Sequence, residues 1–334
     1  MKISGIFIAL LLLFTLVACD QGTPSRPTVV TNQCTNIATT NLTAHGTVTG
    51  ENITRRGFYY GADPLYGLNF DGVDDIVRLP AGSRPIGAFT LAIWCKPTSW
   101  DHANYPGLFG GAGLRTYEGG LFGIAINRYQ NYIYFDVADA TNAARRTIAP
   151  LINNIAPVGQ WSFIVLTNSG VAEAGGLKLY RNSAVLIGNT TGAASVRWSE
   201  NQTYLGYGGA SGCYFKGIIG EVRIYDRTLN TTEVQALYHG QDVTGSLRGY
   251  WKLDEGSGTI AYDSSGNGNN GTLKNGPVWF VGGDSVDETG NFGSGAYSLA
   301  ITGLVPDTWY RIMAFADNGL GTGYGNVVTC KTLP

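Results

Sequence analysis

The strand that decides the fold is Phe89-Thr-Leu-Ala-Ile-Trp-Cys-Lys-Pro97. Successive side chains of a β-strand point to opposite faces, so Phe89, Leu91, Ile93 and Cys95 line one face of this strand. Short runs of the same kind, separated by turn residues, recur almost to the end of the chain. The pattern predicts an all-β protein.

The composition agrees with sheets joined by tight turns. Charged residues make up 14% of the 334 residues and aromatic residues 12%, and there are 48 glycines. Few charges, many turn-forming glycines and many β-forming side chains are typical of β-sandwiches. The net charge of −2 gives no electrostatic reason to propose nucleic acid as a partner.

One segment is predicted to be a helix. Asn230 can cap it, Glu233 completes a capping box and Gly240 ends it. Two hairpins are also predicted, one with its turn at residues 127–131 and one with its turn at residues 181–183. A single short helix in a long β-chain is typical of a sandwich.

The middle of the chain resembles the laminin G-like domains, which belong to the concanavalin A-like lectin/glucanase superfamily. Several stretches carry the resemblance, namely residues 67–77, 89–97, 161–166, 177–180, 215–225 with the helix that follows, 249–259 and 263–273. It covers about residues 67–280 and implies a jelly-roll sandwich.

The order of these stretches is unusual. The block at residues 249–273 usually opens such a domain, whereas here it closes the domain. A permutation of this kind brings the two ends of a domain together, which is the geometry that insertion into another domain requires.

The residues on either side resemble the two parts of one fibronectin type III domain. Residues 27–31, 41–49 and 54–61 are similar to its first three strands, and residues 295–304 resume the pattern. Leu304-Val-Pro-Asp-Thr-Trp-Tyr310 matches the family's Leu-x-Pro-x-Thr-x-Tyr run, in which the tyrosine hydroxyl bonds a backbone group.

Neither flank could bury its apolar face alone. We therefore expect a concanavalin A-like jelly-roll sandwich at residues 65–280, inserted into an immunoglobulin-like (fibronectin type III) β-sandwich formed by residues 27–64 and 281–334. Two separate incomplete domains are the alternative.

The first residues have the features of an export signal. Lys2 precedes an apolar run, residues 3–17, that is too short to span a bilayer. Leu-Val-Ala-Cys19 resembles the bacterial lipoprotein cleavage box, which implies a signal peptide at residues 1–19 and a lipid on Cys19. An ordinary secretory signal with a chance cysteine is the alternative. Residues 20–26 would then be a linker, and the lipid alone would anchor the protein at the cell surface or the periplasmic face of a membrane.

Four further cysteines, Cys34, Cys95, Cys213 and Cys330, allow three connectivities. Two of them fall in each expected domain, so we favour the pairs Cys34–Cys330 and Cys95–Cys213. Free buried thiols are the alternative.

The resemblance also raises the question of Ca²⁺, because laminin G-like domains commonly have Asp where this chain has Gly220. Asp263, Asn267 and Asn269 could offer oxygen ligands to this cation, but we favour a turn in which their side chains bond local backbone amides. We likewise interpret Asp71, Asp74 and Asp75 as turn and surface residues.

We find no catalytic constellation and expect the protein not to be an enzyme. The Glu-x-Asp-x-x-Glu strand of the glucanase branch is absent, and the three histidines show no metal-ligand spacing. The acidic stretches 254–255 and 284–288 are interpreted as solvated loops.

Loop aromatics are the candidate ligand-binding residues. Trp100, Tyr105 and Tyr117 lie in the Gly/Pro-rich stretch 98–120, and exposed rings of this kind can stack on the apolar faces of sugars. We favour packing over a sheet edge for these rings, and exposed stacking on a ligand is the alternative.

The favoured hypothesis is therefore an adhesin, a surface lipoprotein whose lectin-like domain binds a glycan or a matrix or surface protein. A structural spacer or assembly subunit of the cell envelope is the first alternative. A glycoside-active enzyme is the second, and it requires two carboxylates about 5–9.5 Å apart across a cleft.

Overall fold

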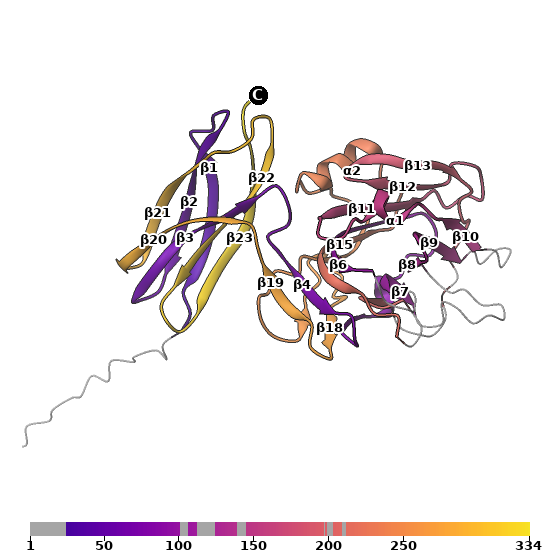
Figure 1. The fold of residues 1–334 in the computed structure, drawn as a ribbon, viewed down its shortest axis with the longest axis horizontal. Helices are drawn as coiled ribbons and strands as arrows, with labels where there is room; N and C mark the ends of the chain where they lie inside the picture. The colour runs from indigo at the N-terminus through magenta and orange to yellow at the C-terminus, as the bar shows by residue number, and fades with distance from the viewer. Residues whose placement is uncertain are drawn as a thin grey trace, which may run out of the picture.

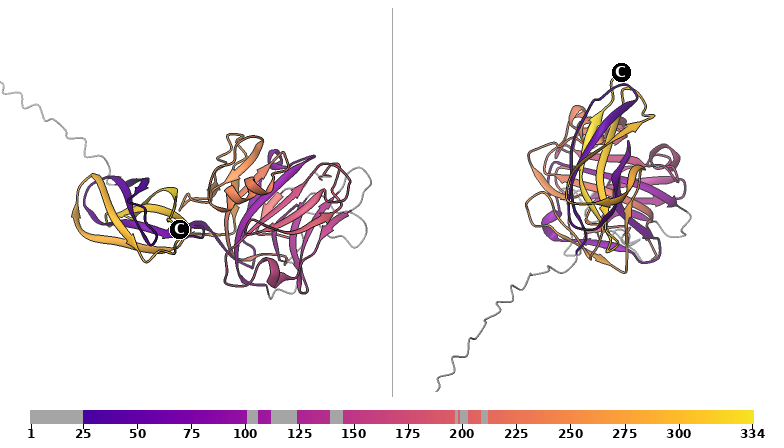
Figure 2. Two further views of the ribbon diagram at one scale, coloured as in Figure 1. Left: turned by 90° about the horizontal axis from the view of Figure 1, so that it is seen from above. Right: turned by 90° about the vertical axis from the view of Figure 1, so that its left-hand side faces the viewer.

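The computed structural model describes residues 25–100, 106–111, 124–138, 145–196, 198, 203–208 and 212–334. Within these residues the chain forms two bodies of β-sheet that lie side by side (Figure 1). We call the strands from Tyr66 to Val281 the jelly-roll sandwich, and those of residues 28–61 and 284–331 the flanking sandwich. Figure 2 shows the same two bodies from above and from one end.

The jelly-roll sandwich consists of two large sheets, and short helices connect some of their strands. The helix-bearing sheet has, in spatial order, β13 (Ala184–Thr190), β12 (Leu177–Arg181), β11 (Ser162–Asn168), β6 (Phe89–Ser99), β15 (Lys216–Tyr225), β4 (Tyr66–Asp71) and β19 (Val278–Val281), with β16 (Leu247–Trp251) also paired to β15. The opposite sheet has β10 (Arg145–Ile148), β9 (Tyr132–Ala138), β8 (Ile124–Tyr129), β7 (Gly107–Gly111), β14 (Thr203–Leu205), β5 (Ile76–Leu79), β18 (Gly271–Lys274) and β17 (Ile260–Ala261). The helices are η1 (Ala81–Ser83), α1 (Ile152–Ile155) and α2 (Thr231–Tyr238).

Strand β6 has the two faces that the alternation in its sequence predicts, and both of them are buried. Phe89, Leu91 and Ile93 belong to the core between the two sheets. Ala92 and Trp94 point the other way and pack beneath α2. The strand is therefore central to the sandwich.

Helix α2 begins and ends as the sequence predicts. The Asn230 side chain accepts from the Glu233 amide at 3.0 Å, and the Glu233 carboxylate accepts from the Asn230 amide at 2.9 Å. Gly240 adopts a φ of 73°, in the left-handed region that favours glycine after a helix. In the described part of the chain, no helix combines the length and apolar character that crossing a membrane requires.

Both predicted hairpins form, and each turn is shorter than predicted, since Arg181 belongs to β12. Asn182 and Ser183 have positive φ angles between β12 and β13, as a two-residue hairpin turn requires. In the other hairpin, β8 runs on to Tyr129, so residues 127–129 are strand and the turn is tighter than the one predicted.

The flanking sandwich is assembled from both ends of the described chain. One sheet has the order β1 (Thr28–Thr35), β2 (Asn41–Thr49) and β21 (Gly295–Thr302); the other has β20 (Asp284–Phe292), β3 (Ile53–Gly61), β22 (Trp309–Asp317) and β23 (Thr322–Lys331). Leu42 and Phe58 from the first segment share one core with Ile301 and Ile312 from the second. Each segment thus buries the apolar face of the other.

Two details of this sandwich bear on the sequence predictions. The Tyr310 hydroxyl accepts from the Val305 amide at 2.9 Å, which is the predicted tyrosine corner. The prediction of a solvated loop at residues 284–288 is wrong, because these residues begin strand β20. This strand reads as polar because it is an exposed sheet edge whose acids pair with arginines of β3, such as Asp287 with Arg55 at 2.8 Å.

The two sandwiches are in contact through buried side chains. The Tyr66 hydroxyl donates to the Gly325 carbonyl at 3.1 Å. Arg311 of β22 donates to the carbonyl of Tyr238 at the end of α2, at 3.0 Å, and its guanidinium lies 5.1 Å from the centre of the Trp94 ring. The junction therefore joins the outer face of the helix-bearing sheet to strands β22 and β23.

Candidate functional site

Trp100 is not an exposed stacking ring, so the packing interpretation is confirmed for this residue and the ligand-binding hypothesis is wrong for it. Its side chain is 5% exposed, its ring centre lies 5.5 Å from that of Phe215, and its indole nitrogen donates to the Ala156 carbonyl at 2.9 Å. The apolar ring is hidden because it extends the core of the jelly-roll sandwich. Tyr105 and Tyr117 lie outside the described residues.

A different group of aromatic residues is partly exposed beside the predicted loop. Tyr204, Tyr207 and Tyr214, which we call the tyrosine cluster, have ring centres 5.4 Å apart (Tyr204–Tyr207) and 5.1 Å apart (Tyr207–Tyr214). Thr203 and Leu205 on either side of Tyr204 are fully buried, so Tyr204 points away from the core.

The tyrosine cluster adjoins the Gly/Pro-rich stretch that the sequence singled out. Strand β7, which that stretch contributes, pairs with β14, so Tyr204 lies opposite Gly110. The Gly107 backbone lies so close to the segment after β14 that a Cβ at Gly107 would be 2.2 Å from the Gly208 Cα. A binding surface near residues 98–120 would therefore include the tyrosine cluster. The sequence did contain a signal for the tyrosine cluster, namely three tyrosines in the glycine-rich stretch 204–214.

The residues considered for Ca²⁺ at 263–269 form a turn instead. Asp263 accepts from the amides of Tyr250, Ser265 and Asn269 and from the Ser265 hydroxyl, at 2.8 to 2.9 Å. These bonds lower the pKa of Asp263 against the opposing effect of burial. Asn267 and Asn269 donate to the Arg248 carbonyl. Because both carboxylate oxygens are already used by donors, these residues do not fit a cation site, and the turn interpretation is confirmed.

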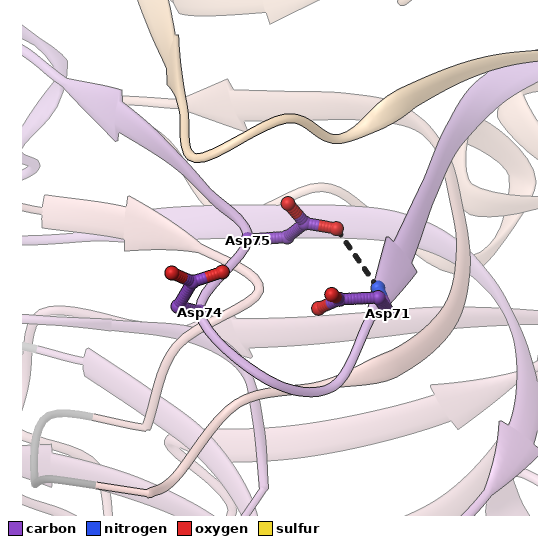
Figure 3. Close-up of side chains that lie close together, drawn as sticks. All are labelled: Asp71, Asp74 and Asp75. Atoms are coloured by element: carbon purple, nitrogen blue, oxygen red, sulfur yellow. Dashed lines mark hydrogen bonds between the residues drawn. The ribbon is translucent and has the colours of Figure 1, made fainter.

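Asp71, Asp74 and Asp75 form an acidic cluster whose oxygens lie within 4.8 Å of one another (Figure 3). Asp75 accepts from the Asp71 amide at 2.9 Å, and Asp71 accepts from the Val73 amide at 2.7 Å. Burial raises the pKa of Asp75. The Asp71 and Asp75 side chains thus hold the turn between β4 and β5, as predicted. Asp71 and Asp74 are exposed, but Asp75 is buried, so its interpretation as a surface residue is wrong.

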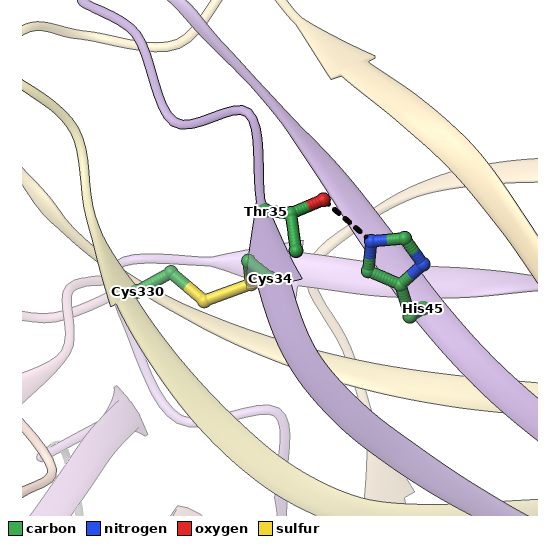
Figure 4. The surroundings of a disulfide bond; sticks show 4 residues. All are labelled: Cys34, Thr35, His45 and Cys330. Atoms are coloured by element: carbon green, nitrogen blue, oxygen red, sulfur yellow. Dashed lines mark hydrogen bonds between the residues drawn. A yellow bond between two sulfur atoms is a disulfide. The ribbon is translucent and has the colours of Figure 1, made fainter.

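The cysteines pair in one domain and not in the other. Cys34 of β1 and Cys330 of β23 form a disulfide that joins the two sheets of the flanking sandwich (Figure 4). The predicted Cys95–Cys213 pair is wrong, because no disulfide joins these two buried residues. Lys216 at the start of β15 lies opposite Ser99, four residues from Cys95, which is about 13 Å along the strand. Cys213 precedes β15, and a disulfide needs a Cα separation below about 7 Å.

A polar cleft lies between the two sandwiches. This interdomain cleft has a volume of about 420 Å³. Glu221 and Arg223 of β15 and Tyr250 of β16 form one wall, and Gln33 of β1 and residues 326–329 of β23 form the opposite wall. The cleft therefore needs both sandwiches, because each supplies one of its walls.

The wall from the jelly-roll sandwich carries a network of charged side chains. Arg223, which is 3% exposed, donates to the Tyr250 hydroxyl at 2.7 Å, and that hydroxyl donates to Oε2 of Glu221 at 3.1 Å. Asp242 reaches Arg223 from the solvent side at 3.0 Å. Burial alone would lower the pKa of Arg223, but Glu221 and Tyr250 outweigh burial and raise it. The guanidinium therefore stays charged in the cleft.

Two polar atoms of this network have no hydrogen-bond partner among the described residues. They are Oε1 of Glu221 and Nε of Arg223, and both are buried. Asp254 lies in a loop, as predicted, but it is only partly exposed and it lines the cleft. Burial raises the pKa of Asp254, Lys252 opposes the change and Glu221 adds to it. The alternation of β15 does predict that Glu221 and Arg223 share a face, but not what lies opposite them.

Gly220 has a packing role at the edge of this site. A Cβ at Gly220 would lie 3.1 Å from Cβ of Trp94 and 3.4 Å from Cβ of Pro64. Pro64 belongs to the segment that leads from the flanking sandwich into the jelly roll. A larger residue here would push that segment away.

Some solved structures are similar to this chain, and no curated protein matches its sequence. A candidate carbohydrate-binding protein from Bacteroides ovatus is 17% identical, with a TM-score of 0.48, over 75% of this chain and 71% of that one. Domain 4 of AbnA, a GH43 extracellular arabinanase from Geobacillus stearothermophilus solved with arabinotriose, is 18% identical, with a TM-score of 0.38, over 64% and 87%. NanB sialidase from Streptococcus pneumoniae is 12% identical, with a TM-score of 0.39, over 82% and 39%.

One family model also matches the chain. Residues 71–235 match the family described as the concanavalin A-like lectin/glucanases superfamily. The match covers most of the jelly-roll sandwich, including β6, β11 and β15. The described chain is thus an all-β protein with a lectin-like jelly-roll domain.

Proposed function

We propose that this protein is a non-catalytic glycan-binding protein, and that its jelly-roll sandwich recognises the glycan through the tyrosine cluster. The observation that carries this proposal is the partly exposed group of three tyrosine rings on and beside strand β14 of a lectin-like domain. Tyrosine rings stack on the apolar faces of sugars, and their hydroxyls bond sugar hydroxyls.

The position of the cluster supports this role. Tyr207 and Tyr214 face each other across an isolated β-bridge, which limits the freedom of both rings before a ligand arrives. Rings that are already held in place lose little conformational entropy on binding.

The other parts of the chain would display this domain. We propose a lipid on Cys19, a linker at residues 20–26, and a fibronectin type III-like sandwich, interrupted by the jelly roll, as the spacer at a cell surface. The protein would then serve in adhesion to a glycan or to a glycosylated surface protein. The disulfide Cys34–Cys330 is consistent with export, since disulfides persist in oxidising compartments.

A glycan array on the soluble chain from residue 20 onward tests the binding site. We expect Tyr207→Ala and Tyr214→Ala each to weaken binding by about tenfold, as loss of a stacked ring does. Tyr262→Ala is the matched control, because Tyr262 is 55% exposed and follows β17, three strands from β14 in the same sheet.

Thermal unfolding of each variant shows whether its fold is intact. An array with no bound glycan overturns the proposal. Equal weakening by Tyr262→Ala removes the cluster as the site. Release of reducing sugar from a bound oligosaccharide would show an enzyme, and co-purification of a stoichiometric protein partner without sugar affinity would show an assembly subunit.

A further inference from the structure

We infer that the interdomain cleft is a second ligand site, and that it takes one neutral sugar residue. The inference rests on the proposed glycan binding for its class of ligand, whereas its location rests on the structure alone. The cleft lies against the outer face of the helix-bearing sheet, and the tyrosine cluster lies at the opposite sheet. The two sites therefore use different faces of the jelly-roll sandwich.

The size of the cleft fits a small molecule. Ligand pockets are commonly about 300–1,000 Å³ in volume, and the cleft has about 420 Å³. Its two walls belong to sandwiches that are already in contact through Tyr66 and Gly325. The cavity is therefore present before any ligand arrives.

The unpaired atoms of the cleft define what a ligand must offer. Oε1 of Glu221 is a buried acceptor without a donor, and Nε of Arg223 is a buried donor without an acceptor. A buried polar group without a partner costs about 1–3 kcal/mol. Both atoms are closed to water in this structure, so a small shift of their side chains must first expose them to the cleft. A sugar hydroxyl can then donate to the first atom and accept from the second, because a hydroxyl does both.

The charges of the cleft select a neutral ligand. Three cations (Arg223, Lys252 and Arg311) and three acids (Glu221, Asp242 and Asp254) line it. Arg311 is already bonded to backbone carbonyls, and Arg223 already contacts Glu221 and Asp242. The cations and acids balance in number, so an anion gains no net opposite charge in the cleft, whereas hydroxyl groups can bond both kinds of side chain.

The flanking sandwich completes the site. Gln33 is exposed on β1, so the wall opposite Arg223 also offers a side-chain amide, whereas both ends of the Asn326 amide are bonded to the Thr31 backbone. The bare Cα of Gly220 lets the Pro64 segment approach, which keeps this wall close. Insertion of the jelly roll into the flanking sandwich is what creates the cleft.

Saturation-transfer NMR on the chain from residue 20 onward tests the inference, with D-glucose, D-galactose, L-arabinose and N-acetyl-D-glucosamine as probes. We expect at least one sugar to bind. Glu221→Gln, which removes a charged acceptor, and Gln33→Trp, which fills the mouth from the other sandwich, should each weaken binding by about tenfold or more. Val30→Trp is the control for Gln33→Trp, since Val30 is 47% exposed on the same strand and does not line the cleft.

The outcomes separate this site from the tyrosine cluster. Loss of the signal in both cleft variants, with Tyr207→Ala and Val30→Trp unchanged, supports the inference. Loss in Tyr207→Ala alone, or in Glu221→Gln without Gln33→Trp, overturns it and leaves the proposed function intact. Glycan-array binding with no monosaccharide signal also overturns it. A blank array together with no NMR signal overturns both.

Discussion

Removal of the Cys34–Cys330 disulfide should destabilise the flanking sandwich and leave the jelly-roll sandwich nearly unchanged. The cysteines are 296 residues apart in sequence, but most of that loop is the folded jelly roll. If the jelly roll stays folded while the flanking sandwich opens, the flexible loop is roughly 80 residues, and loop-closure entropy gives a stabilisation of about 4.5 kcal/mol. Global unfolding would free all 296 residues, for which the same relation gives about 5.7 kcal/mol.

The double variant Cys34→Ala/Cys330→Ala tests this reasoning by native-state hydrogen exchange read by mass spectrometry. We expect the opening free energy of β2 and β22 to fall by about 4–5 kcal/mol, and that of β6 and β11 to change by less than about 1 kcal/mol. Wild-type protein reduced with dithiothreitol should match the variant, and the variant should not respond to reductant. Equal losses in both sandwiches would show one cooperative unit and refute the shorter loop. A loss below about 1 kcal/mol in the flanking sandwich would refute the entropic argument altogether.

Two further predictions concern the same sandwich and its junction with the jelly roll. Tyr310→Phe removes the bond from the Val305 amide and should lower the free energy of unfolding by about 0.5–1.5 kcal/mol in a urea titration, whereas Tyr262→Phe on the surface should have no effect. His239 stacks on Trp309 at 5.7 Å, and burial, with help from Arg311 and Lys331, lowers its pKa. Because the folded state binds this proton less readily, stability is complete above the unfolded pKa of about 6.5 and falls as the pH drops through that value. The urea concentration at the unfolding midpoint should therefore decrease as the pH is lowered from 8 to 5, and His239→Gln should make that decrease smaller. An equal decrease in the variant would contradict the assignment to His239.

Local patterns were enough to predict the strands and the helix. The alternation from Phe89 to Cys95 predicted a strand, and Asn230, Glu233 and Gly240 predicted the limits of α2. Such signals can be read from sequence because side-chain direction repeats every two residues in a strand, and because a helix cap involves neighbours within three residues. Polar edge strands are harder to predict from the sequence. Strand β20, for example, has few apolar residues and is held by its pairing with β3.

Exposure and pairing of single side chains were not predictable in the same way. Trp100 and the tyrosine cluster are both aromatic residues in glycine-rich stretches, yet Trp100 is buried and the tyrosines are partly exposed. Cys34 meets Cys330 and Cys95 does not meet Cys213, although each pair falls within one sandwich. The difference depends on strand register, which sets which residues lie opposite one another over long sequence separations.

The sequence by itself determined an all-β chain, the jelly-roll resemblance in its middle and the matching apolar faces of its two ends. Tertiary structure alone decided that Glu221 and Arg223 face Gln33 and Asn326 across a cavity. The physical reason is that alternation assigns a side chain to a face of its own strand, whereas a site requires groups from separate bodies to meet. That meeting depends on how closely the bodies pack, here at Gly220, Tyr66 and Arg311.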